Sequence, residues 1–135
     1  IDDYGHHPTE VAAILEVARG FDRPVSVLFQ PHRYSRTATF AQEFADALTS
    51  ADIVGLLPVY AAGEAPPAGV DSGLIAGHLA DRGRPDVSLL AGMDNIPAWL
   101  DGFVAEGGLV LTLGAGDIGR QVEGICRHLA ARDEG

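Results

Sequence analysis

The stretch PVSVLFQPHRYSRT, residues 24–37, decides the fold. Its first half is short, apolar and rich in β-branched residues, which predicts a buried strand over residues 24–29. Its second half is polar and predicts a loop over residues 30–36. Thr37 then predicts the start of a helix to about Ser50, because aromatic and aliphatic residues recur there at helical spacing. A buried strand joined by a short loop to an amphipathic helix is the repeating unit of α/β proteins.

The same alternation continues along the rest of the chain. Further strands are predicted at residues 52–57, 86–90 and 109–113, and further helices at 9–19, 71–81, 95–105 and 118–131. Proline and glycine predict a long loop over 58–70. The pattern predicts a Rossmann-like three-layer α/β/α domain with a mostly parallel sheet. Right-handed crossovers in such a sheet place ligands outside the carboxyl ends of its strands.

Composition and net charge limit the kinds of function that the protein can have. The 135 residues fit one domain that can bury a core. The formal net charge of −10 argues against nonspecific binding to nucleic acid or anionic membrane, because polyanions repel an acidic surface. No apolar run approaches the roughly 18 residues of a membrane span. The single cysteine, Cys126, cannot form an intrachain disulfide and is expected to pack as a small hydrophobe.

The opening residues IDDYGHHPT, 1–9, gather two carboxylates, a phenol and two imidazoles just before a predicted helix. His7 or Thr9 would cap that helix. The chain has no initiator Met and Ile1 reads as the end of a strand, so we expect a piece of a longer protein. This cluster and the polar loop at 30–36 then lie at the same, carboxyl, edge of the sheet. Two polar loops at that edge predict a ligand site.

Arg33 and Arg36 are the strongest binding candidates in the second loop. A planar guanidinium binds a carboxylate or phosphate at two points, and the loop leaves the carboxyl end of a strand, where a ligand is expected. The alternative is a pair of surface arginines that balance the acidic protein's own carboxylates. The chain contains no lysine, which excludes a lysine-based phosphate clamp.

Two further patterns leave alternatives open. GAGDIG at residues 114–119 has the spacing of a dinucleotide fingerprint, but no further strand follows to supply the acidic partner that such sites need. It is otherwise a tight turn that allows close strand–helix packing, or a helix start that faces a phosphate or carboxylate. His6, His7 and His32 suggest zinc, yet their spacing fits no standard zinc pattern. Helix capping or pairing with carboxylates is the alternative for these histidines.

Four segments, in order, resemble signatures in the C-terminal domain of the Mur ligases of peptidoglycan synthesis. They are DDYGHHPTE (2–10), FQPHRYSRT (29–37), VYAAGE (59–64) and GAGDI (114–118), and the resemblance covers the whole chain, 1–135. It implies an ATP-dependent, cytoplasmic bacterial ligase whose N-terminal and central domains are absent from this chain. In such ligases the first domain holds the UDP-sugar and the central domain holds ATP and Mg2+.

Within the family, the segments resemble most the branch that joins L-alanine to UDP-N-acetylmuramate. The resemblance implies that ATP phosphorylates the muramoyl carboxylate and that the amine of alanine attacks the acyl phosphate. Arg33 and Arg36 would hold the alanine carboxylate, and Asp3 would contact the ribose of the nucleotide. The other implied residues are Tyr4, His6 and His32 in the alanine pocket, and Gly114, Gly116 and Asp117 in a turn near the domain junction. No metal ligand, and no ligase activity, is expected of this chain alone.

Two alternatives remain at this point. A related Mur ligase attaches a recycled tripeptide to the same sugar acid and shares the Asp- and His-rich opening. The loop HRYSR, 32–36, favours a compact pocket for one amino acid instead. The alternative from another class is a stand-alone nucleotide- or anion-binding module without catalysis.

Overall fold

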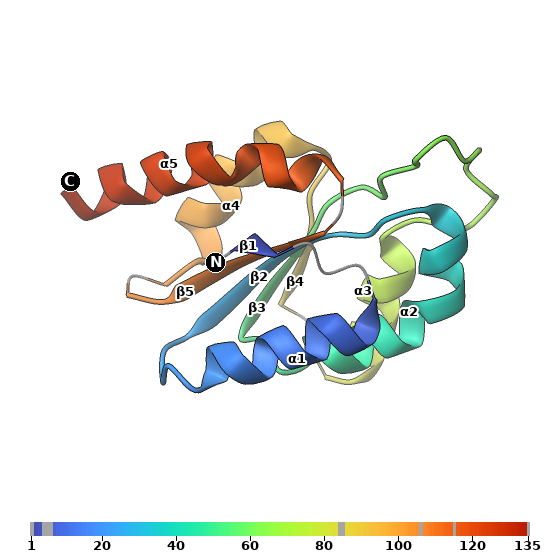
Figure 1. The fold of residues 1–135 in the computed structure, drawn as a ribbon, viewed down its shortest axis with the longest axis horizontal. Helices are drawn as coiled ribbons and strands as arrows, with labels where there is room; N and C mark the ends of the chain where they lie inside the picture. The colour runs from blue at the N-terminus through green and yellow to red at the C-terminus, as the bar shows by residue number, and fades with distance from the viewer. Residues whose placement is uncertain (1, 4–6, 84–85, 106, 115, 135) are drawn as a thin grey trace.

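A five-stranded parallel sheet forms the centre of the molecule (Figure 1). The computed structural model describes residues 2–3, 7–83, 86–105, 107–114 and 116–134. The strands are β1 (Asp2–Asp3), β2 (Val25–Gln30), β3 (Ile53–Leu56), β4 (Val87–Leu89) and β5 (Leu109–Gly114). Their order across the sheet is β1-β5-β2-β3-β4, and every neighbouring pair is parallel. The sheet is therefore wholly parallel, as α/β alternation in the sequence predicts.

Helices cover both faces of the sheet, which confirms the three-layer α/β/α architecture (Figure 1). One face carries α1 (Pro8–Arg19), α2 (Tyr34–Leu48) and α3 (Gly73–Asp81). The other carries α4 (Ile96–Phe103) and α5 (Val122–Glu134), with the short 3-10 helices η1 (Met93–Asn95) and η2 (Asp117–Gln121) before them. None of the described helices is long and apolar enough to cross a lipid bilayer.

The core consists of two apolar layers separated by the sheet. Strand β2 is buried along its whole length and contributes to both layers. Val27 and Phe29 pack against α1, α2 and α3, whereas Leu28 faces the layer under α4 and α5. Alternate side chains of a strand point to opposite faces, so a strand covered on both sides reads as one continuous apolar run. This burial explains why residues 24–29 are such a clear strand signal.

Helix α1 begins as the sequence predicts. His7 is its N-cap, and the His7 Nδ1 accepts a hydrogen bond from the Thr9 backbone N–H at 3.2 Å. Pro8 occupies the first turn, where its missing N–H leaves no intrahelical bond unmade. The helix-cap interpretation of His7 is thereby confirmed.

Two expectations are wrong. Helix α2 begins at Tyr34, three residues before Thr37, so Arg36 lies in a helical turn rather than a loop. Thr37 does not cap the helix; its hydroxyl donates to the Arg33 carbonyl at 2.8 Å from inside the first turn. Cys126 is exposed, because it follows the inward-facing Ile125 by one position and is rotated about 100° around α5 from it.

Strand register brings three strand ends together. Gln30, the last residue of β2, pairs with Gly114, the last residue of β5. Asp3, the last residue of β1, pairs with Leu113 on the other side of β5. The carboxyl ends of β1, β5 and β2 therefore lie side by side, at the edge where ligands bind in parallel α/β sheets.

Candidate functional site

The described parts of both polar segments lie at the carboxyl edge of the sheet. The backbone of Asp3 ends β1, and the turn that carries His32, Arg33 and Arg36 follows directly after β2. Only β5 separates the two strands. The expectation that both segments occupy one edge is therefore confirmed for their backbones. Tyr4 and His6 lie outside the described residues, and so does the side chain of Asp3.

The two arginines differ in their surroundings. Arg33 is the N-cap residue of α2 and has backbone angles φ 70° and ψ 140°, in the left-handed region of φ that few non-glycine residues adopt. Its exposed guanidinium forms no hydrogen bond or ion pair within the described part of the chain. Arg36 is half-buried, and its Nη1 lies 3.4 Å from the His32 Nδ1. Arg33 is thus directed to solvent, whereas Arg36 is held against the imidazole.

Tyr60 holds His32 in place. The two rings stack at a centroid distance of 5.5 Å, with planes 14° apart. The backbone of Tyr60 also pairs with this turn. Its carbonyl accepts from the Arg33 N–H at 2.7 Å, and its N–H donates to the Pro31 carbonyl at 2.8 Å. Motif spacing alone assigns Tyr60 no role, although the VYAAGE segment that contains it is one of the four family signatures.

The glycine-rich turn after β5 packs against the same residues. A Cβ placed on Gly116 would lie 2.6 Å from the Tyr60 Cγ and 2.8 Å from the Gln30 Oε1. Gly114 has φ +146°, and a Cβ there would lie 2.8 Å from the Gln30 carbonyl oxygen. These close approaches support the tight-turn interpretation of residues 114–119. A Cβ placed on Gly119 would meet nothing within 4 Å, so the third glycine of the apparent fingerprint serves no close approach in this structure.

Gln30 links the end of β2 to the turn after β5 through a hydrogen bond. Its side chain is buried, and its Oε1 accepts a hydrogen bond from the Ile118 backbone N–H at 2.8 Å. The bond closes the first turn of η2, in which Asp117 is half-buried. Gln30, like Tyr60, was absent from the predicted site residues. Its signal was a polar residue at the end of an otherwise apolar strand.

Glu64 supplies an acceptor to the start of α2. Its Oε1 accepts from the Ser35 N–H at 3.0 Å, and its Oε2 accepts from the Ser35 hydroxyl at 2.6 Å. The hydrogen bond from the Ser35 hydroxyl, and then that from the Ser35 backbone, lower the pKa of Glu64 below its ordinary value; the Arg33 charge contributes in the same direction. Glu64 is therefore ionised at neutral pH.

The histidines do not assemble into a metal site within the described chain. His7 caps α1, and its ring lies 5.0 Å from that of Phe40. His32 lies between Tyr60 and Arg36. No three His, Cys, Asp or Glu side chains cluster as a metal site requires among residues 2–3, 7–83, 86–105, 107–114 and 116–134.

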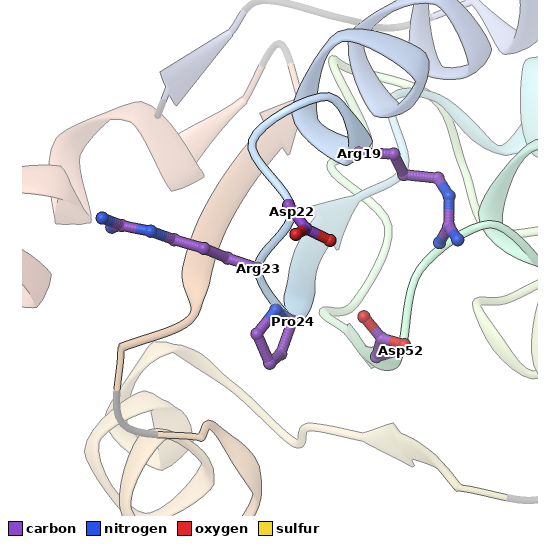
Figure 2. Close-up of a pocket in the computed structure, with 5 residues that line it drawn as sticks. All are labelled: Arg19, Asp22, Arg23, Pro24 and Asp52. Atoms are coloured by element: carbon purple, nitrogen blue, oxygen red, sulfur yellow. The ribbon is translucent and has the colours of Figure 1, made fainter.

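A hollow of about 330 Å3 lies at the opposite edge, before β2 and β3 (Figure 2). It is lined by Arg19, Asp22, Arg23, Pro24 and Asp52. The Arg19 guanidinium donates to the Ser50 carbonyl at 2.6 Å, and the Asp52 carboxylate accepts from the Val25 N–H at 2.8 Å. Arg23 extends away from the hollow (Figure 2). The hydrogen bonds of Arg19 and Asp52 therefore stabilise the loops at the amino ends of the strands, away from the edge where ligands are expected.

Fold and edge together define a class: a parallel α/β domain with an arginine- and histidine-bearing turn at the carboxyl end of a central strand. The chain matches the family model of the Mur ligase glutamate ligase domain over residues 1–116, and it belongs to that family. The resemblance seen in the four sequence segments is thereby confirmed.

Curated relatives named UDP-N-acetylmuramate–L-alanine ligase match nearly the whole chain. The protein of Mycobacteroides abscessus is 48% identical over 97% of this chain, and that of Trichlorobacter lovleyi is 42% identical over 96%. The protein of Geotalea uraniireducens is 43% identical over 96%. The chain spans only 27%, 29% and 28% of the length of these three relatives.

Solved structures share the fold at low sequence identity. A murein peptide ligase of Psychrobacter arcticus superimposes with a TM-score of 0.72 at 19% identity, covering 94% of this chain and 26% of that one. A domain described as a UDP-N-acetylmuramate:L-alanyl-γ-D-glutamyl-diaminopimelate ligase from Haemophilus ducreyi gives a TM-score of 0.66 at 19% identity. That match covers 96% of this chain and 87% of that one.

Proposed function

We propose that this chain is the C-terminal domain of an ATP-dependent ligase that joins L-alanine to UDP-N-acetylmuramate. The observation that carries the proposal is 42–48% identity, over nearly the whole chain, to three relatives named for that reaction. The tripeptide-attaching alternative has support only from structures at 19% identity, which share the fold. The sequence comparison therefore favours alanine.

In this proposal the chain binds the amino acid and orients it. The exposed Arg33 guanidinium and the half-buried Arg36 guanidinium would hold the alanine carboxylate. His32, fixed by Tyr60 and Arg36, would form a wall of the pocket, and Tyr4 and His6 of the opening segment would complete it. Holding the carboxylate leaves the amine free to point at the activated sugar acid, which removes much of the entropic barrier to attack.

The remaining parts of the reaction belong to domains that precede this one in the proposal. ATP would activate the muramoyl carboxylate as an acyl phosphate, and the central domain would hold most of the nucleotide and Mg2+. Asp3, at the end of β1, would reach the ribose when the domains close. Gly114, Gly116 and Asp117 would lie near the domain junction. A bacterial cytoplasmic location, where UDP-sugar acids and ATP are present, is part of the same proposal.

The test is phosphate release by the full-length protein that contains this chain, with ATP and UDP-N-acetylmuramate supplied. Release that depends on L-alanine is the expected result. Release that depends on the tripeptide instead would identify the related ligase, and no release with either L-alanine or the tripeptide would favour a non-catalytic binding module. Residues 1–135 alone are expected to form no amide bond from the same substrates.

A further inference from the structure

The first turn of α2 lacks a capping side chain of its own. The first N–H groups of a helix have no partner within the helix and are usually satisfied by a Ser, Thr, Asp or Asn at the N-cap. Arg33 occupies that position here and makes no side-chain capping bond. It also holds a backbone conformation with φ 70° that a non-glycine residue adopts at a cost in energy. Something outside the helix must therefore stabilise this turn.

The β3–α3 loop, residues 57–72, provides that support through three kinds of contact. Its backbone pairs at Tyr60 with Pro31 and Arg33, and the Tyr60 ring stacks on His32. Glu64 then reaches Ser35, 29 residues away in sequence, with both carboxylate oxygens. The loop therefore contacts the arginine-bearing turn on both sides of Arg33, at Pro31 and at Ser35.

Electrostatics favour a carboxylate at this place. Glu64 lies at the N-terminal end of α2, where the helix dipole favours negative charge, and the positive charge of Arg33 further lowers its pKa. With Glu64 accepting the Ser35 N–H and hydroxyl, these donors are occupied by the protein itself. The guanidinium groups of Arg33 and Arg36 then remain for an external carboxylate.

We propose that Glu64 is a positioning residue for amino-acid binding, which sets the orientation of Arg33 and Arg36 by capping α2 through Ser35. The inference rests on the proposed function and deepens it. It assigns to Glu64 no contact with substrate. Its effect is therefore expected on the binding of the amino acid, and not on the binding of ATP or the sugar nucleotide.

Steady-state kinetics of the full-length protein test this assignment. Glu64→Ala is expected to raise the KM for L-alanine about tenfold, the size of one lost charge-assisted hydrogen bond, with kcat and the KM for ATP within about twofold. Glu64→Gln keeps an acceptor for the Ser35 N–H and a donor for its hydroxyl, so it should stay within about threefold of wild type. Glu123→Ala is the matched control, because Glu123 is an exposed acid on α5 whose one ion pair among the described residues is with Arg127.

A double-mutant cycle identifies the route of the effect. Ser35→Ala should raise the alanine KM in the wild-type background and add little in Glu64→Ala, because the hydroxyl bond that it removes is already absent from Glu64→Ala, whereas the Ser35 backbone N–H is unchanged by the substitution. Full additivity would overturn the capping route. An unchanged alanine KM in Glu64→Ala, or a joint fall of kcat with a rise of every KM, would overturn the positioning role while alanine-dependent turnover by wild type still supports the proposed function. Absence of that turnover in wild type would overturn both.

Discussion

The side-chain oxygen of Gln30 accepts a hydrogen bond from the backbone N–H of Ile118 at 2.8 Å, and so joins the end of β2 to the first turn after β5. Both residues are buried. The bond closes the carboxyl edge beneath the arginine-bearing turn. Its loss would leave a backbone donor without a partner in a site that water does not readily reach.

Gln30→Met is therefore expected to reduce the free energy of unfolding by about 1–3 kcal/mol, the usual penalty for an unsatisfied buried polar group. Urea denaturation measures this change directly. Gln42→Met is the control, because Gln42 is exposed on α2 and the same substitution there leaves no buried donor. Equal stability of Gln30→Met and wild type would show that the bond contributes nothing net.

Gly116→Ala is expected to disturb the site through Tyr60. The new Cβ would approach the Tyr60 Cγ at 2.6 Å, so the ring or the turn must move. Such overpacking costs about 1–3 kcal/mol, and a displaced Tyr60 loosens its stack on His32. We expect a lower melting temperature and a higher alanine KM together.

Gly119→Ala is the matched control for Gly116→Ala, since Gly119 lies in η2, the 3-10 helix that Gly116 precedes as N-cap, and its Cβ would meet no atom within 4 Å. Its melting temperature and alanine KM should match those of wild type. If Gly116→Ala also behaves as wild type, the close packing of Tyr60 on this turn does not maintain the site.

Local patterns in the sequence were sufficient to predict the architecture. Continuous apolar character marks β2 because helices cover both its faces, and His7 followed by Pro8 marks the start of α1 with groups that are adjacent in sequence. The arginine-bearing turn could also be placed, because parallel strands bring their carboxyl ends to one edge.

The start of α2 and the role of Tyr60 were not predictable in the same way. The acceptor for the first turn of α2 is Glu64, which is distant in sequence and reaches Ser35 only after the chain has passed through β3. Tyr60 likewise contacts His32 through the fold and not through spacing. A search for capping residues next to a helix cannot detect partners that tertiary structure supplies.

Stability should depend on pH through Glu64. Its folded-state pKa is lowered from an ordinary value of 4.5, so its contribution is fully present above that pH and is lost as pH falls through the lower folded-state pKa. Glu64→Gln should therefore be less stable than wild type at pH 7, and the difference in melting temperature should shrink below about pH 4.5. Glu123→Gln is the matched control, because Glu123 forms an exposed i,i+4 ion pair with Arg127 and exposed pairs of this kind contribute little to stability. A difference in melting temperature between Glu64→Gln and wild type that stays constant from pH 7 to pH 3 would contradict this assignment.

Arg33→Ala and Arg36→Ala test whether the carboxylate of alanine binds to these two arginines. Each removes a guanidinium that the proposal places on the alanine carboxylate, and a hydrogen bond to a charged group contributes about 1.5–3 kcal/mol, so the alanine KM should rise about 10- to 100-fold. The KM for ATP should change much less. Arg127→Ala, an exposed arginine on α5, controls for the loss of positive charge from an acidic protein. Arg36→Ala also frees the His32 ring from its 3.4 Å contact, so we expect it to have the larger effect. An unchanged alanine KM in both variants would place the amino acid elsewhere.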